Sequence, residues 1–183
     1  MDKTAKTELY RTFLIEQLPE PLTRASAHIQ LFDNYIANTR MRLRTVRNPD
    51  SKEWTYILQQ RMHSETLAFQ TKLAEIYLNE AEHERFEIFE GTEIRKNRYF
   101  HEYDGRTVEF DVYIGKLWGL NIARVEFDDE SDLREYEPPP FVFCEITDNA
   151  FFRGENLVGR TFEDVQAEVA KLDIPARQAA SME

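Results

Sequence analysis

The sequence is poor in several residue types, and each shortage excludes a class of structure. Cys144 is the only cysteine among 183 residues, so an intrachain disulfide is excluded and a reducing compartment suits the chain. No run of about 18 apolar residues is present to form a transmembrane helix, and the first residues lack the apolar stretch of a signal peptide. Four histidines lie scattered without the spacing of a zinc site. We therefore expect a cytoplasmic protein that does not bind membranes.

Positive charge is also in deficit. The chain has 34 acidic against 23 basic residues and a formal net charge of −11, so general binding to nucleic acid is not expected. Basic residues gathered inside such a protein would mark a local site. With 42% hydrophobic and 13% aromatic residues the chain can build a substantial core. Its length predicts a single domain over residues 1–175, followed by a C-terminal tail over residues 176–183.

Three consecutive strands are predicted in the middle of the chain. They cover Ile94–Tyr103, Thr107–Ile114 and Leu120–Phe127. Asp104 and Gly105 join the first two, because an Asp-Gly pair tolerates the positive φ angles of a tight hairpin turn. In each strand one face carries charges of both signs and the opposite face is apolar. The pattern fits either a sheet with one solvated face or a barrel with a charged lumen.

Strands are also predicted on both sides of this region, and they outnumber the helices. Their short connections favour antiparallel pairing. Asn79 suits the cap of a helix reaching about Phe89, and Thr161 with Asp164 resembles a capping box before a helix over Phe162–Leu172. The further predicted strands cover Glu8–Ile15, Ala27–Ala37, Thr39–Val46, Glu53–Met62, Thr66–Tyr77 and Phe141–Thr147.

Charged residues recur at every second position in at least five of these strands. They cannot form a dry core, because burying unpaired ions costs several kcal/mol each. They face bulk water and pair with one another, or they face a wet lumen where a ligand compensates them. Arginine and lysine suit phosphate oxygens, and carboxylates suit Mg²⁺ or Mn²⁺. The charged positions are Glu8, Arg42, Arg44, Lys96, Arg98, Asp111, Arg124, Glu126 and Glu145.

The order of these motifs resembles the CYTH superfamily of triphosphate tunnel metalloenzymes. The motifs are ELYRTFL, RLR, IRKNRYF, GRTVEFDVYIGKLWGL, ARVEF and PPPFVFCEIT, and the likeness runs from about Glu8 to Leu157. It implies an α+β fold, an antiparallel eight-stranded β-barrel with helices packed outside. It also implies a tunnel in which basic residues grip a triphosphate group while glutamates hold one or two divalent metals. Family members hydrolyse inorganic tripolyphosphate or thiamine triphosphate, or cyclise ATP.

Carried over by position, the resemblance assigns two sets of site residues and a cofactor. The cofactor is Mg²⁺ or Mn²⁺, and the partner is a small molecule that contains a triphosphate group. No catalytic residue is assigned, and Arg11 matches a flanking position that points outward. The phosphate-binding set is Arg42, Arg44, Lys96, Arg98 and Arg124, and the metal-binding set is Glu8, Glu126 and Glu145.

Several positions depart from the family pattern. Arg124 stands where a glutamate belongs, and a cation directed at a metal site repels the metal. Arg124 is either a fixed cation that partly replaces a metal or the partner of Glu126 or Glu145. Three functions stay open: a metal-dependent triphosphatase, a phosphate- or nucleotide-binding module with little turnover, and a structural barrel of mutual ion pairs. The other departures are Tyr10 and Thr12 in the opening motif, Gln60 in place of a lysine, and Glu75 as the one candidate acid between Phe69 and Tyr77.

Overall fold

The computed structural model describes residues 5–86 and 92–172. Nine antiparallel strands make up one sheet, and its pleat sends alternate side chains to opposite faces. The strands are β1 (Ala5–Leu14), β2 (His28–Tyr35), β3 (Met41–Arg47), β4 (Trp54–His63), β5 (Gln70–Leu78), β6 (Thr92–Tyr103), β7 (Arg106–Tyr113), β8 (Asn121–Phe127) and β9 (Cys144–Glu145).

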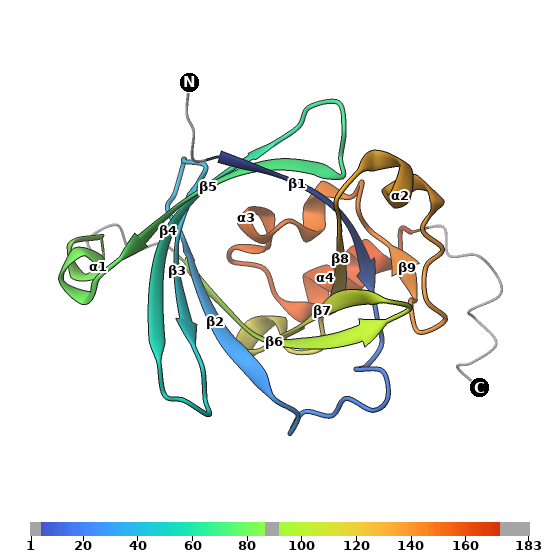
Figure 1. The fold of residues 1–183 in the computed structure, drawn as a ribbon, viewed down its shortest axis with the longest axis horizontal. Helices are drawn as coiled ribbons and strands as arrows, with labels where there is room; N and C mark the ends of the chain where they lie inside the picture. The colour runs from blue at the N-terminus through green and yellow to red at the C-terminus, as the bar shows by residue number, and fades with distance from the viewer. Residues whose placement is uncertain (1–4, 87–91, 173–183) are drawn as a thin grey trace.

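The sheet closes on itself. Its order is β5-β4-β3-β2-β6-β7-β8-β1-β9, and β1 pairs back to β5, so eight strands form a ring (Figure 1). Ala5–Leu9 of β1 pairs with β5, and further along β1 Phe13 lies opposite Glu145 of β9. The predicted eight-stranded antiparallel barrel is confirmed.

Local sequence accounts for the tightest connection of the barrel. Asp104 and Gly105 have φ angles of 49° and 71°, as the turn between β6 and β7 requires. Two predicted strands are shorter than expected. Leu67 and Gln70 form a turn, so β5 begins only at Gln70, and β9 keeps just two residues of Phe141–Thr147.

Short helices lie outside the ring or across its end. α1 (Glu80–Phe86) begins at Asn79, whose side chain accepts from the Glu82 amide at 2.9 Å, and the rest of the predicted helix lies outside the described residues. α4 (Phe162–Val169) has the predicted capping box but ends before Leu172. The other helices are α2 (Glu130–Glu135), α3 (Gly154–Leu157) and the 3₁₀ turns η2 (Gly115–Leu117) and η3 (Ala150–Phe152). No helix in residues 5–86 and 92–172 is long and apolar enough to cross a bilayer.

The apolar residues form two clusters, one outside one wall of the barrel and one inside it, at the end covered by the C-terminal segment. One cluster, around the fully buried Phe13 and Phe110, packs beneath α2 and the chain that follows it. A second, around Leu120 and Leu157, packs beneath α4. Among the described residues, β3, β4 and β5 contribute nothing to either cluster. The strands β1, β6, β7 and β8 therefore turn their apolar faces outward, and their inner faces carry the charges and, near the covered end, the second cluster.

The C-terminal segment lies across one end of the barrel, where Figure 1 shows α3 within the ring of strands. Gly154 packs so closely on β2 that an added Cβ would lie 1.8 Å from the hydroxyl oxygen of Tyr35. Glu155 pairs with His63 of β4. Only glycine permits the first of these contacts, and the two together fix the segment against β2 and β4.

Candidate functional site

The barrel encloses a charged cavity of about 300 Å³, the smaller end of the range for ligand sites. Because side chains alternate along each strand, alternate residues from stretches of the eight barrel strands line it, with Tyr35 as the single contribution of β2. The charged faces therefore meet in a lumen, and the reading as a solvated outer face is wrong. The cationic side chains are Lys6, Arg42, Arg44, Arg61, Lys96, Arg98, Arg124 and Arg153, and the acidic ones are Glu8, Glu75, Glu109, Asp111, Glu126 and Glu155.

Two predicted arginines share one buried carboxylate. Arg44 donates from Nε to Asp33 Oδ1 at 2.6 Å and from Nη2 to Oδ2 at 2.7 Å, and Arg42 Nη1 donates to Oδ2 at 3.2 Å. Burial opposes the charge of Asp33, which is 1% exposed, but Arg42 and Arg44 outweigh it and hold the pKa of the carboxyl well below its usual range. Asp33 thus stays ionised and fixes both guanidinium groups.

A second carboxylate serves the other predicted cations in the same way. Asp111 accepts from Lys96 Nζ at 2.5 Å, and it receives two bonds from Arg98, at 2.6 and 2.8 Å. Burial lowers the pKa of the Lys96 ammonium to about 8, and the attraction of Asp111 only partly offsets this. Lys96 therefore changes charge just above neutral pH.

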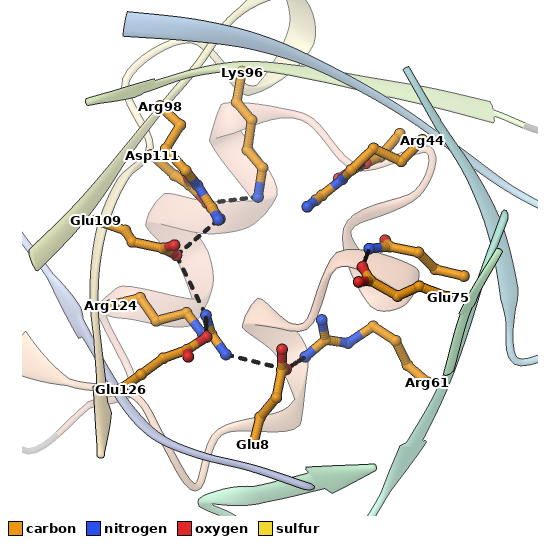
Figure 2. A network of polar contacts seen from close by, with 12 residues as sticks. Glu8, Arg44, Arg61, Glu75, Lys96, Arg98, Glu109, Asp111, Arg124 and Glu126 are labelled. Carbon is orange, nitrogen blue, oxygen red and sulfur yellow. Dashed lines mark hydrogen bonds and ion pairs between the residues drawn. The ribbon is translucent and has the colours of Figure 1, made fainter. Parts of the chain in front are cut away.

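Arg124 meets three acids beside Arg98 in the lumen, with Glu109 between the two guanidinium groups (Figure 2). Its Nη2 lies 3.1 Å from Glu8, and its Nη1 lies 3.3 Å from Glu109 and 2.5 Å from Glu126. The Tyr10 ring lies 4.6 Å from the guanidinium carbon. Burial raises the pKa of Glu126, but Arg124 outweighs this effect and lowers it. Arg124 is thus the shared partner of three carboxylates.

The prediction that Gln60 faces the lumen from β4 is wrong by one residue. Arg61 and Gln59 line the cavity, whereas Gln60 is not among the lining residues. Arg61 Nη2 lies 3.3 Å from Glu8, and Gln59 is hydrogen-bonded to Glu75, which faces the lumen as expected. Arg61 is therefore the basic residue that this strand offers.

Glu145 does not join the other predicted metal ligands. It lies outside the cavity lining, where Arg11 donates to it at 2.9 and 2.6 Å. Arg11 also donates to the carbonyl of Tyr136 at 2.6 Å, so it points outward as predicted. Of the three predicted ligands, Glu8 and Glu126 line the lumen and Glu145 stabilises the contact between β1 and β9.

Comparison with known proteins gives two curated relatives. The chain is 33% identical over 69 residues, 37% of its length, to an inorganic triphosphatase of Nitrosomonas europaea, and the match covers 46% of that protein. It is 31% identical over 71 residues, 39% of its length, to an inorganic triphosphatase of Acetivibrio thermocellus, covering 44% of that protein. The chain therefore spans less than half the length of the curated relatives it matches. No protein-family model matches it.

Two solved structures share the barrel over most of its length. A hypothetical protein superposes with a TM-score of 0.58 at 23% identity, over 84% of this chain and 99% of the other. An inorganic triphosphatase superposes with a TM-score of 0.57 at 24% identity, over 82% and 93%. The chain shares the fold of these two proteins, and at these identities the likeness concerns the fold alone.

The carboxylates of this barrel do not fit a metal site as they stand. Within the described residues, no group of three or more His, Cys, Asp or Glu side chains is arranged to hold a metal ion. Glu8, Glu109 and Glu126 do converge, but on the guanidinium of Arg124. An ion placed among them would meet a fixed positive charge. The described carboxylates therefore serve as partners of arginine in this lumen rather than as ligands of a metal ion.

Proposed function

We propose that the barrel binds the triphosphate group of a small molecule in its lumen and acts on it as a phosphohydrolase. The observation that carries this proposal is the uneven sharing of charge between the two sides of the cavity. On one side, four cations share three carboxylates, and one of these carboxylates also pairs with Arg124. The cations are Arg42, Arg44, Lys96 and Arg98, and the carboxylates are Asp33, Asp111 and Glu109.

This cationic side suits a polyphosphate. Bidentate bonds to Asp33 and Asp111 orient Arg44 and Arg98, so neither guanidinium has to be ordered when an anion binds. Figure 2 shows Arg44 and Lys96 reaching toward the middle of the lumen. Arg61 adds a further cation from β4. The anion gains contacts with several fixed positive groups in a largely buried site, where electrostatic attraction is stronger than in water.

Hydrolysis of the triphosphate is the activity that the relatives favour. Both curated relatives are named inorganic triphosphatases, which suggests inorganic tripolyphosphate as the substrate. Fixed cations stabilise the negative charge that develops as a phosphoryl group is transferred. The carboxylates around Arg124, Glu8 and Glu109, supply acceptors that can orient a water nucleophile.

The second candidate function is binding of a triphosphate group without turnover. The position of Arg124 favours it, because Arg124 occupies three of the carboxylates that would otherwise hold a metal or a water. The barrel would then keep its cationic side and use its acidic side only for structure.

Calorimetric titration with tripolyphosphate, combined with an assay of phosphate release on the same samples, tests both functions. Arg95→Ala is the matched control, because Arg95 lies on the exposed side of β6 and pairs there with Glu93. Binding of tripolyphosphate with phosphate release, in the unmodified protein and in Arg95→Ala, supports the phosphohydrolase. Binding without release supports the second candidate, and no binding rejects both.

A further inference from the structure

The guanidinium of Arg124 lies where carboxylates from three strands meet. Glu8 comes from β1, Glu109 from β7 and Glu126 from β8, and all three bind the two terminal nitrogens of this one guanidinium. Figure 2 shows the dashed contacts converging there. Three carboxylates facing one point repel one another unless a cation lies between them. In this chain a side chain supplies that cation.

The strand register keeps Arg124 in this position. It lies opposite Glu109 on β7 and opposite Thr12 on β1, so one neighbour is an acid and the other a short side chain that leaves room for the guanidinium. The Tyr10 ring packs on the guanidinium, and the Arg124 side chain is 14% exposed. The burial and the three ion pairs make Arg124 a fixed part of the lumen.

We infer that the Arg124 guanidinium takes the place of a divalent metal on the acidic side of the lumen, so that this barrel binds its triphosphate in the metal-free form. The inference rests on the proposed function and narrows its ligand. Other cations of the chain help Arg124 to neutralise the three acids, so no ion from solution is needed. They are Arg61, which pairs with Glu8, Arg98, which pairs with Glu109, and Lys6, which pairs with Glu126. An incoming Mg²⁺ would be repelled by Arg124 and would find Glu8, Glu109 and Glu126 already paired.

Free tripolyphosphate and its Mg²⁺ complex should differ in their affinity for this lumen. Mg²⁺ in solution neutralises part of the charge of tripolyphosphate, and the four cations Arg42, Arg44, Lys96 and Arg98 attract the complex less than the free anion. Excess Mg²⁺ should therefore weaken binding to this chain. A site that depended on metal would show the opposite.

Titration of the unmodified protein with tripolyphosphate, in EDTA and in excess MgCl₂, decides the question. We expect a lower Kd in EDTA than in MgCl₂. Binding that is as tight or tighter in MgCl₂ overturns the inference and leaves the proposed function standing. No binding in either buffer rejects the proposed function itself, and the inference with it.

A substitution gives an independent readout that needs no phosphate. Arg124→Glu adds a fourth carboxylate beside Glu8, Glu109 and Glu126, so MnCl₂ should raise its melting temperature. The unmodified protein and Arg95→Glu, which has the same charge change on the outer face of β6, should show no such rise. An equal rise in all three proteins contradicts the inference. If Arg124→Glu does not fold, the titration of the unmodified protein still decides.

Discussion

Glu155 Oε1 lies 2.9 Å from His63 Nε2, and this pair joins the segment across the barrel end to strand β4. Thr71 is hydrogen-bonded to the other ring nitrogen of His63 at 2.9 Å, and the hydroxyl of Tyr10 lies 3.0 Å from the Thr71 hydroxyl. A chain of contacts therefore runs from the C-terminal segment to the ring that packs on Arg124. The covering segment and the lumen are one connected structure.

The first prediction concerns this contact. Glu155→Gln should lower the free energy of unfolding by roughly 0.5 kcal/mol, because the side chain is partly exposed and solvent weakens the pair. Burial opposes the charge of Glu155, but the bond to His63 prevails and lowers its pKa, so this stabilisation is lost as the pH falls toward the carboxyl range. Urea unfolding at neutral and acidic pH measures the effect. Glu65→Gln, an exposed change in the β4–β5 loop, is the control, and equal losses in both variants would contradict the prediction.

The second prediction concerns pH and Lys96. Since the pKa of Lys96 is lowered to about 8, a rise in pH through that value removes a cation, and tripolyphosphate binding should weaken between about pH 7 and pH 9. Lys96→Arg should abolish this part of the pH dependence, because arginine stays charged. Titration calorimetry of both proteins over this range gives the comparison. An identical pH profile would show that Lys96 does not contribute.

The lowered pKa of Lys96 also affects the free energy of unfolding, and it does so in the opposite direction to binding. The folded pKa of Lys96 lies below the ordinary value of 10.5, so the unfolded chain binds more protons between about pH 8 and that value. Lys96 should therefore make the unfolding free energy rise with pH across this window. Urea unfolding of the unmodified protein should show this rise. The Lys96→Arg protein, whose arginine stays charged over the same pH window, is the reference and should lack this contribution.

The third prediction concerns the cationic side. Arg42→Ala with Arg44→Ala should raise the Kd for tripolyphosphate by about a hundredfold or more, since two buried charges are lost. The double variant also leaves Asp33 buried without a partner, at a cost of about 3 to 5 kcal/mol. Asp33→Asn should be added to recover the fold, and binding should stay weak in the triple variant. Unchanged binding in a folded variant would refute the assignment of this side to phosphate.

The fourth prediction separates the structural acid from those of the lumen. Glu145→Gln should lower the unfolding free energy by about 1 kcal/mol, because it weakens a bidentate pair between the exposed Glu145 and the partly buried Arg11. It should leave the Kd for tripolyphosphate unchanged, since Glu145 lies outside the cavity lining. Thermal melting and calorimetry on the same samples test this. A weaker Kd with unchanged stability would place Glu145 in the site.

The barrel could be predicted from the sequence because period-two alternation places opposite chemistry on the two faces of a strand. Lys96 and Arg98 on β6 and Arg124 and Glu126 on β8 share faces in this way, and all four line the lumen. The alternation fails in β4, where both faces mix polar and apolar residues. Arg61 was missed for that reason, and no local signal distinguishes it from Gln60.

Only part of the ion pairing could be predicted from the sequence: the pair of Arg124 with Glu126 was one of the expected alternatives and is present, whereas the partners of several other charged residues were not expected. Asp33 follows apolar neighbours in β2, and only the pairing with β3 brings it opposite Arg44. Glu145 sits in an apolar run that suggests a long strand, but only two residues of that run pair with β1. Which carboxylate meets which cation depends on contacts across the barrel.

The outer apolar cluster gives the barrel unequal walls. Among the described residues, its packed side chains lie outside β1, β6, β7 and β8, whereas β3, β4 and β5 contribute nothing to it. Lys96, Asp111 and Arg124 therefore stand on a wall with an apolar core behind it, whereas Arg42 and Arg44 stand on a wall held by strand pairing and by the ion pairs within the lumen.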